Sequence, residues 1–327
     1  MSAIVFKIHS DFYYVKNSDG IEFECKMRDV LKKRHVDICV GDFVELSEDK
    51  NFIIERKERF NALLRPHVAN IDCAVIVCSL KEPELNLIQL NRYLTYLKYF
   101  NIEAMVCFNK LDLDTSSHKE INEIYENLGY KTFFTSAKNK SGIHEIKKNI
   151  KDKTIVLCGM SGVGKSTLLN ALMPYANAKT ANVSKGNLKG RHTTRHCEIK
   201  EYDDFKIVDT PGFSCLKFDF LLPNELIDLF DDLKVYKDSC KFSDCLHNSK
   251  EKGVCAVFDN LDKIPLSRYE SYLCFLDEAL SYREKISKTS IKKEQNQKVS
   301  GHLTKVKISK RKRDFSRKKL KQNIENY

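Results

Sequence analysis

The stretch from residue 154 to residue 167, TIVLCGMSGVGKST, decides the fold of the central part of the chain. An apolar run typical of a buried strand leads into the pattern G-x-x-x-x-G-K-[ST], and STLLNAL continues with helical spacing. In such a loop the glycines let backbone N–H groups point at phosphate oxygens, and the helix N-terminus favours their negative charge. The alternative, a glycine turn before a helix, would not need Lys165 and Ser166 where they stand.

We therefore predict a phosphate-binding loop that ends on a helix. Lys165 would contact the β- and γ-phosphates of a nucleoside triphosphate, and Ser166 would bind Mg²⁺. The residues of this loop that we predict to bind the nucleotide are Gly159, Met160, Ser161, Gly162, Val163, Gly164, Lys165, Ser166 and Thr167.

A second phosphate-side motif, DTPG at residues 209–212, ends the strand-like run FKIVD. Asp209 can hold the Mg²⁺ through a water molecule, and the Gly212 N–H can bind the γ-phosphate. Alone, this tetrapeptide is a common turn, but downstream of a phosphate loop it is specific.

Two loops upstream have the chemistry that selects guanine. In the first, residues 109–112 (NKLD), the Asp112 carboxylate can accept hydrogen bonds from the guanine N1–H and amine, donors that adenine does not present together. Asn109 would brace this loop, and the Lys110 stem would pack over the base. The alternative for both loops is that they are merely charged connections.

The second loop, residues 135–138 (TSAK), follows the next strand-like run. The Ala137 N–H can meet the guanine O6, and the aliphatic part of Lys138 can cover the ring, with Ser136 beside them. The base-reading loops precede the phosphate loop, which reverses the order of ordinary GTP-binding domains. The same site can form if the domain is circularly permuted.

The surrounding sequence predicts three structured units. Between residues 70 and 158, strand-like runs such as CAVIVCSL alternate with helical spacing, which indicates a parallel sheet with helices on its faces. Residues 1–60 contain five short strand-like runs, typical of a small β-barrel, and RPHVANID at 65–72 would be a linker. After Pro223 we expect helices at NELIDLFDDL and at about 266–286.

A Cys/His cluster lies in the third unit. Cys240, Cys245, His247 and Cys255 supply three thiolates and one imidazole, a set suited to tetrahedral, structural Zn²⁺. The alternative is four unrelated residues on a surface loop. The other cysteines fall mostly in apolar runs, and we expect them to be small buried hydrophobes. We see no pattern of a secretory signal, so we do not expect disulfides.

The charge of the chain is concentrated at its end. The 327 residues carry a net charge of +11, and residues 283–327 contribute 16 Lys and Arg against 4 Asp and Glu. The remainder is close to neutral, so we expect a neutral body with a basic tail that attracts nucleic-acid phosphates, or that serves solubility or localisation. No run approaches the ~18 apolar residues of a membrane span. We expect a cytoplasmic monomer without a membrane partner.

Taken together, the permuted order, the N-terminal barrel, the GRHTT sequence at 190–194 and the Cys/His cluster resemble the RsgA/YjeQ family of GTPases that depend on the small ribosomal subunit. The resemblance covers about residues 1–285. It implies an OB-type β-barrel at 1–65, a circularly permuted α/β P-loop GTPase domain at 66–223 and a helical zinc-binding domain at 224–286. A basic, disordered tail would occupy 287–327.

The segment 190–194 lies where a switch loop should sit. A threonine there can complete Mg²⁺ coordination with Ser166 and Asp209; between Thr193 and Thr194 we favour Thr194. Phe213 stands where many GTPases carry a water-orienting glutamine, so slow intrinsic hydrolysis is expected. The resemblance implies that His192 takes this role on the ribosome and acts with Lys165 and Thr194; alternatively, His192 only contacts phosphate or solvent.

The resemblance thus implies a GTP hydrolase that matures the small ribosomal subunit, binds its rRNA and leaves after hydrolysis. Tyr13, Tyr14 and Phe23 of the barrel could stack on bases or simply pack in the barrel. A different hypothesis is an RNA-binding scaffold in which GTP locks the conformation and turnover is negligible. A third, an ATP-dependent P-loop kinase, is disfavoured by the two guanine-reading loops.

Overall fold

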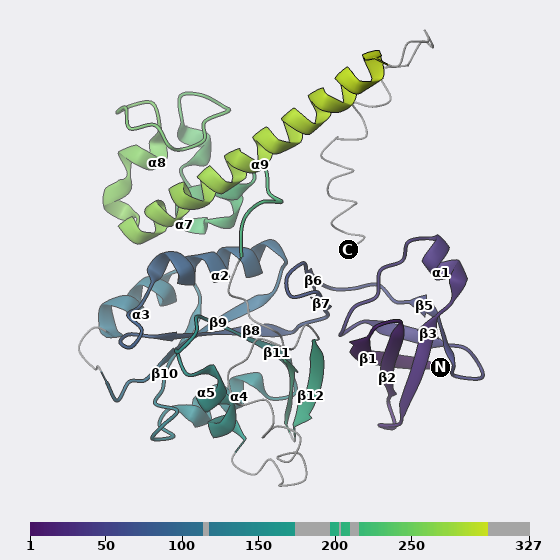
Figure 1. Cartoon of the computed structure of the whole chain (residues 1–327). Coiled ribbons are helices and arrows are strands. Elements are labelled where there is room, and N and C mark those ends of the chain that lie inside the picture. The colour runs from purple at the N-terminus through teal and green to yellow at the C-terminus, as the bar shows by residue number, and fades with distance from the viewer. Residues whose placement is uncertain (114–117, 174–196, 203, 210–215, 300–327) are drawn as a thin grey trace.

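The computed structural model describes residues 1–113, 118–173, 197–202, 204–209 and 216–299. Within them, a central sheet carries a β-barrel on one side and a helical unit above one face (Figure 1). No helix of these ranges combines the length and the apolar character that crossing a bilayer requires.

The central sheet is mostly parallel. Its strands are β8 (Cys73–Ser79), β9 (Glu103–Asn109), β10 (Lys131–Phe134), β11 (Thr154–Cys158), β12 (Glu198–Tyr202) and β13 (Phe205–Asp209). They lie in the order β10-β9-β8-β11-β13-β12, and only β12 is antiparallel to its neighbour β13. Every residue of β8 is buried, as expected for a strand covered on both faces.

Helices cover both faces of this sheet. Helices α2 (Leu87–Tyr99) and α3 (His118–Asn127) lie on one face, and α4 (Ile143–Ile150) and α5 (Lys165–Leu172) on the other (Figure 1). Alternate residues of β8 belong to the two cores: Ala74 and Ile76 face α2, whereas Val75 and Val77 face α4 and α5. The predicted parallel α/β architecture is therefore confirmed.

The chain order explains the unusual order of the motifs. After β10 at the sheet edge, the chain returns to the middle of the sheet as β11, next to β8. Because the strands are parallel, the ends of β9, β10 and β11 meet at one edge despite their reversed order in the sequence. The strand order therefore agrees with the circular permutation that the motif order predicts.

The N-terminal barrel comprises β1 (Ser2–His9), β2 (Phe12–Asn17), β3 (Glu22–Met27), β4 (Phe43–Leu46) and β5 (Phe52–Arg56), with helix α1 (Asp29–Lys33). It closes because β1 pairs with both β2 and β4, while β5 joins β3 to β4. Tyr13 and Phe23 pack partly against the barrel core. Strand β1 also pairs with β12 at Lys7 and Glu198, so barrel and central sheet are continuous.

The segment expected to be a linker instead belongs to a hairpin whose second strand is buried. Strands β6 (Ala62–Leu63) and β7 (Val68–Ala69) pair, and Val68 and Ala69 are fully buried. The asparagine side chains satisfy the backbone there: Asn70 accepts from Phe60 N at 3.1 Å and donates to Gly41 O at 2.9 Å. These side-chain bonds replace a longer ladder, and composition alone does not reveal them.

An ion-pair network fixes this hairpin to the barrel. The buried Arg59 contacts Asp42 at 2.6 Å and Asp37 at 3.2 Å, and His67 contacts Asp37 at 2.8 Å. Burial opposes ionisation of Asp37, but the bonds and charges of His67 and Arg59 outweigh it, so the pKa of Asp37 is lowered.

Because the pKa of Asp37 is lower folded than unfolded, its contribution is complete above the unfolded value of about 4 and is lost as pH falls through the folded pKa. We expect Asp37→Asn to cost about 1 kcal/mol at pH 7 and progressively less below pH ~4. Urea unfolding at several pH values measures this. The matched control Asp11→Asn, an exposed turn residue of the same barrel, should cost little at any pH; a deficit of Asp37→Asn that is independent of pH would contradict the assignment.

The C-terminal unit consists of short turns and one long helix. It contains η1 (Leu226–Leu229), α7 (Asp231–Lys234), η2 (Lys237–Ser239), α8 (Ala256–Asp259), η3 (Leu261–Lys263) and α9 (Leu266–Val299). The helix expected at NELIDLFDDL is broken, because Phe230 is extended (φ −118°, ψ 92°) and buries its ring in the core between η1 and α7.

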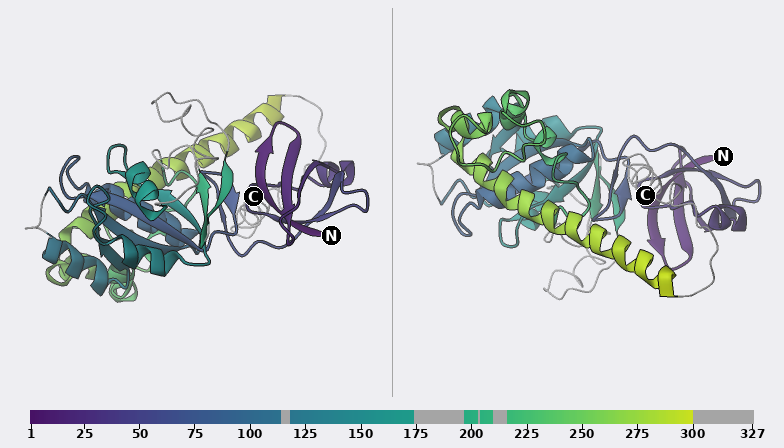
Figure 2. Two further views of the ribbon diagram at one scale, coloured as in Figure 1. Left: turned by 90° about the horizontal axis from the view of Figure 1, so that it is seen from below. Right: turned by 90° about the horizontal axis from the view of Figure 1, so that it is seen from above.

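Helix α9 is longer than expected. We predicted its end near Ile286 and a disordered segment from residue 287, but the helix continues to Val299. The added segment has no Gly or Pro and is rich in Lys and Gln, which are good helix formers. It projects past α2 toward the side of the molecule where the barrel lies (Figures 1 and 2). Residues 300–327, the rest of the predicted tail, lie outside the described residues.

Candidate nucleotide site and metal centre

The loop between β11 and α5 has the backbone form of a phosphate-binding loop. Gly159, Gly162 and Gly164 all have positive φ, which L side chains rarely adopt. A Cβ on Gly159 would lie 2.1 Å from the Val77 carbonyl oxygen, so the loop approaches β8 too closely for any side chain. The glycines therefore shape the loop that precedes the N-terminus of α5.

Lys165 begins α5 and turns back over this loop. Its Nζ donates to the carbonyl oxygens of Gly159 at 2.9 Å and Met160 at 2.7 Å. Burial lowers the pKa of Lys165. Because of these two hydrogen bonds the ammonium lies over the loop, where a phosphate oxygen could replace the two carbonyl oxygens as its acceptor.

A Cβ at Gly164 would stand 2.4 Å from the Asn109 side-chain nitrogen, and the residue has φ +94°. We expect Gly164→Ala to weaken nucleotide binding at least about tenfold, because αL strain of 1–2 kcal/mol adds to displacement of Asn109. Equilibrium binding of a fluorescent GTP analogue measures this. Gly129→Ala is the matched control, since Gly129 also has positive φ but no atom within 4 Å; equal losses in both variants would contradict the steric argument.

Asn109, at the end of β9, braces the base-reading loops against the phosphate loop. Its Nδ2 donates to the Val163 carbonyl at 3.0 Å, while its Oδ1 accepts from Ala137 N at 3.0 Å and from Thr135 Oγ1 at 3.2 Å. The side chain is buried, and one amide therefore joins three loops. The phosphate loop and the two base-reading loops therefore form a single site.

Asp112 is oriented by the loop after β10. Its Oδ1 accepts the Ser136 hydroxyl at 2.5 Å, and this bond lowers the pKa of Asp112. The carboxylate is therefore ionised and acceptor-only, with its remaining lone pairs exposed. Ala137 is buried beside it, whereas Lys138 is exposed. Lys110 Nζ donates to the Glu82 carbonyl.

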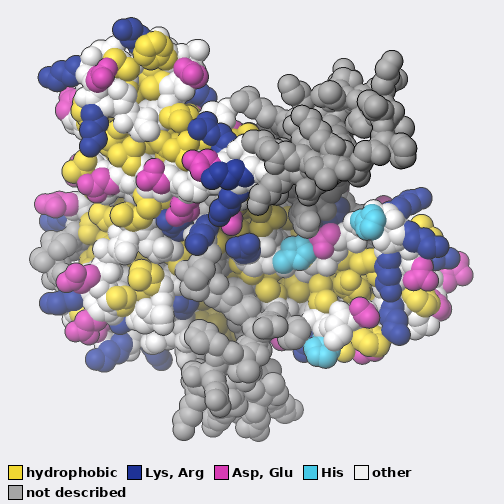
Figure 3. All heavy atoms as spheres, turned by 45° about the horizontal axis from the view of Figure 1, so that its top comes forward, with side chains coloured by type: hydrophobic (Ala, Val, Ile, Leu, Met, Phe, Trp, Pro, Cys, Tyr) yellow, Lys and Arg dark blue, Asp and Glu magenta, His cyan; other side chains and the backbone are white. Residues whose placement is uncertain are grey.

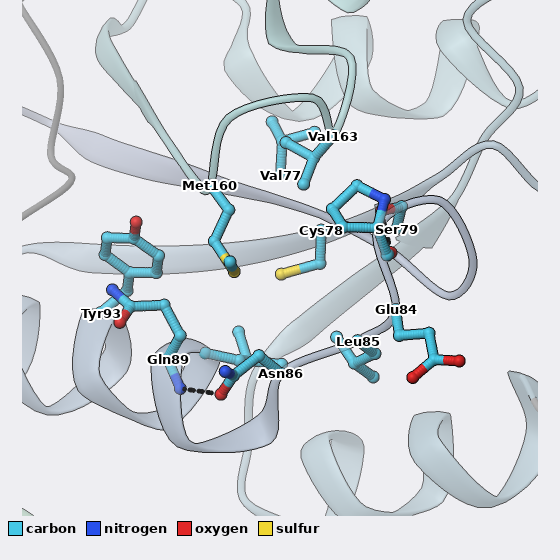
Figure 4. A pocket seen from close by; sticks show the side chains of 12 residues that line it. Val77, Cys78, Ser79, Glu84, Leu85, Asn86, Gln89, Tyr93, Met160 and Val163 are labelled. Atoms are coloured by element: carbon cyan, nitrogen blue, oxygen red, sulfur yellow. Dashed lines mark hydrogen bonds between the residues drawn. The ribbon is translucent and has the colours of Figure 1, made fainter.

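A loop that the sequence analysis did not single out lies beside the phosphate loop. Figure 4 shows Met160 beside Cys78, with Ser79 and Glu84 to one side and Tyr93 of α2 to the other. Asn86 caps α2 by accepting from Gln89 N at 2.9 Å. The signal for this loop was an Asn before the helical run LIQLNRYL, three residues after Pro83.

Several predicted residues lie outside the described part of the chain. These are the switch residues 190–194, with His192, Thr193 and Thr194, and also Gly212 and Phe213. The backbone of Asp209 ends β13, which is parallel to β11 and in register with it through Val208 and Val156. Asp209 therefore lies on the strand next to the one that feeds the phosphate loop.

The four predicted metal ligands converge in the C-terminal unit. One donor atom each of Cys240, Cys245, His247 and Cys255 lies within 4.8 Å of the others. Cys255 and His247 are buried, and burial lowers the pKa of His247, which favours the neutral imidazole that binds metals. Cys240 Sγ lies 3.4 Å from His247 Nδ1. A soft, four-donor set with two buried and two half-buried members suits a closed metal site.

Comparison with known proteins decides the family. A family model described as RsgA GTPase matches residues 55–219, and one described as RsgA N-terminal domain matches residues 3–52. The small ribosomal subunit biogenesis GTPase RsgA of Clostridium botulinum is 39% identical over 293 residues, covering 87% of this chain and 99% of that protein. The chain belongs to the RsgA family of GTPases. A further model, described as 50S ribosome-binding GTPase, matches residues 154–299.

Solved structures agree with the RsgA assignment. The crystal structure of YjeQ from Thermotoga maritima has a TM-score of 0.72 and 32% identity, covering 85% of this chain and 98% of that one. A structure titled YloQ, a circularly permuted GTPase, has a TM-score of 0.68 and 33% identity, covering 86% and 95%. An RsgA-family GTPase implies GTP with Mg²⁺, and the Cys/His cluster could bind a metal.

Proposed function

We propose that this chain hydrolyses GTP as a late maturation factor of the small ribosomal subunit. The observation that carries the proposal is the single amide of Asn109, which joins the phosphate loop to both base-reading loops in a permuted RsgA-family domain. We propose the small ribosomal subunit as the partner because the relatives are named small ribosomal subunit biogenesis GTPases.

In this proposal each loop has a separate task. Asp112 accepts from the guanine N1–H and amine, and Lys110 and Lys138 flank the ring. The Ala137 N–H, which donates to Asn109 Oδ1 in the structure, would turn from this oxygen to O6 when the base binds. The N–H groups of residues 159–167 and the Lys165 ammonium hold the phosphates, with Gly212 at the γ-phosphate. Mg²⁺, held by Ser166, Thr194 and Asp209, would neutralise charge that develops on the phosphates.

His192 is our candidate for orienting the attacking water, with Lys165 and Thr194 as its catalytic partners. Phe213 supports this proposal, because an apolar ring at the position of the usual glutamine cannot orient water. Hydrolysis would then be slow until the subunit orders the switch.

We propose further that Cys240, Cys245, His247 and Cys255 hold one structural Zn²⁺ per chain. The donors fit: three sulfurs and one imidazole, close enough to surround one ion and partly buried. The OB-type barrel at 1–65, the GTPase domain at 66–223 and the zinc domain at 224–286 would act as one monomeric unit on rRNA in the cytoplasm. Figure 3 shows Lys and Arg side chains, with Asp and Glu side chains among them, where the C-terminal unit meets the central sheet, and the basic members could contact RNA phosphates.

The test is GTP turnover with and without purified small ribosomal subunits at moderate salt, for the wild type and His192→Ala. We expect strong stimulation, and a loss of about 10²-fold of the stimulated rate in the variant. Stimulation that survives in His192→Ala would move the catalytic role elsewhere. Tight GTP-dependent subunit binding without turnover would favour the scaffold. If the subunits neither stimulate turnover nor bind the chain, the ribosomal role is overturned.

A further inference from the structure

The segment from Leu216 to Leu221 carries the chain from the central sheet to the C-terminal unit. Its first residue follows β13 by a few residues, and the last residue of β13, Asp209, is the first of the DTPG motif. Leu216, Phe218 and Leu221 are buried, whereas Lys217 between them is exposed. The segment is thus pressed against the helices on one side and open on the other.

Two side chains from different helices hold the backbone of this segment. Arg92 of α2 donates to the Leu216 carbonyl at 3.2 Å, and Glu278 of α9 accepts from the Phe218 N–H at 2.9 Å. Arg92 and Glu278 also pair with each other at 2.8 Å. One ion pair therefore satisfies a carbonyl and an amide two residues apart, which fixes both the place and the direction of the segment.

The surroundings of the pair are apolar. The Arg92 side chain is only 10% exposed, and its guanidinium lies 4.5 Å from the centre of the Phe275 ring and 5.7 Å from that of Phe218. At such an apolar position, well-packed apolar residues of similar volume could stabilise the folded protein at least as well as this ion pair. What the pair adds is position, because Arg92 and Glu278 keep their further hydrogen bonds to the Leu216 carbonyl and the Phe218 N–H only while the segment lies between the two helices.

Helix α2 connects this pair to the nucleotide site. Gln89 and Tyr93, on either side of Arg92 in the helix, line a small cavity together with Met160 and Val163 of the phosphate loop (Figure 4). The helix that holds the segment through Arg92 thus also faces, across this cavity, the loop that we assign to the phosphates.

Helix α9 connects the pair to the metal centre. Tyr269 donates to the His247 carbonyl at 3.1 Å, and Tyr272 donates to the Leu246 carbonyl at 2.8 Å. Arg268 of the same helix pairs with Asp232 at 2.9 Å. The helix that carries Glu278 therefore also holds the loop of the Cys/His cluster, about two helical turns before Glu278. Helices α2 and α9 pack side by side.

We propose that Arg92 and Glu278 are a pair of positioning residues that couple the nucleotide site to the C-terminal unit. They hold residues 216–218 in one place relative to α2 and α9. Contact of the subunit with the C-terminal unit therefore changes the phosphate loop. By linkage, GTP must then alter the C-terminal unit in turn. The inference rests on the proposed function, of which it names the internal coupling.

The first test compares subunit-stimulated GTP turnover in Glu278→Gln, Arg92→Gln and the double variant of the full chain. We expect unstimulated turnover to stay within about twofold and stimulation by purified small subunits to fall about tenfold, a typical coupling between sites. The double variant should be no worse than either single variant, because the residues act as a unit. Asp277→Asn is the matched control: the adjacent residue, exposed, with the same loss of charge.

The second test is hydrogen exchange with GDP and with a non-hydrolysable GTP analogue. In the wild type, exchange at residues 240–255 should differ between the two nucleotides, and in Glu278→Gln this difference should vanish. A merely structural role would alter exchange equally with both nucleotides. Glu278→Gln retains an oxygen for the Phe218 N–H, and it decides the question if Arg92→Gln does not fold.

The outcomes separate the two proposals. A wild type that subunits do not stimulate would contradict the proposed function, and hydrogen exchange would then judge the coupling alone. A stimulated wild type with equally stimulated variants, or a nucleotide-dependent difference that persists in Glu278→Gln, would overturn the coupling.

Discussion

Asp112→Asn is expected to lower the affinity for GTP about 10³-fold or more, because a site built to accept the guanine donors loses its carboxylate. The Ser136 hydroxyl already holds this carboxylate at 2.5 Å and lowers its pKa, so the wild-type group is ionised before the base arrives. An asparagine would present an amide N–H or a single oxygen there. Competition binding against a fluorescent GTP analogue measures the change.

The same variant should gain affinity for xanthosine triphosphate. Xanthine carries an oxygen where guanine carries its amine, and the asparagine amide can donate to that oxygen. Ser136→Ala is the matched control: it keeps the carboxylate but removes its orienting bond, and about a tenfold loss of GTP affinity is expected. Equal binding of GTP by Asp112→Asn and the wild type would place the guanine-reading group elsewhere and would revive an ATP-dependent reading.

The nucleotide site was predictable because each of its parts is local. G-x-x-x-x-G-K-[ST] needs its glycines within a few residues of one another, as the positive φ of Gly159, Gly162 and Gly164 illustrates. The pairing of NKLD with SAK was also predictable, since loops after neighbouring parallel strands lie at one edge. Their link through Asn109 to Val163 follows from the sheet order rather than from the sequence distance.

The features that sequence reasoning missed depend on tertiary contacts. The hairpin β6–β7 is short because Asn61 and Asn70 take over backbone bonding, and the sequence does not show where those side chains point. In the sequence, Arg92 and Glu278 look like ordinary polar residues of two different amphipathic helices, and they are 186 residues apart. Only the packing of α2 against α9 brings them to one segment.

Cys255→Ser, or removal of the metal from the wild type by a chelator, is expected to unfold the C-terminal unit while the nucleotide site still binds GTP. The loops between α7 and α8 contain only one short 3-10 turn, and the buried donors of the cluster would be left unsatisfied. Structural zinc contributes about 10–16 kcal/mol of apparent binding free energy in small metal-dependent folds. We expect the unfolding midpoint to fall by at least about 10 °C, or a separate early transition to appear.

Thermal unfolding followed by circular dichroism, with metal analysis of the purified chain, tests this expectation. Cys274→Ser is the matched control, since Cys274 lies on α9 of the same unit but outside the cluster; its midpoint should change little. One equivalent of zinc in the wild type and in Cys274→Ser, but not in Cys255→Ser, would assign the ligand. Because the guanine-reading and phosphate loops lie on the sheet rather than in the C-terminal unit, loss of GTP binding in step with the metal would mean that α9 and α2 carry the disruption as far as the phosphate loop. A chain that keeps its midpoint without metal would show that the packing of Tyr269 and Tyr272 against the cluster loop is sufficient to hold the unit.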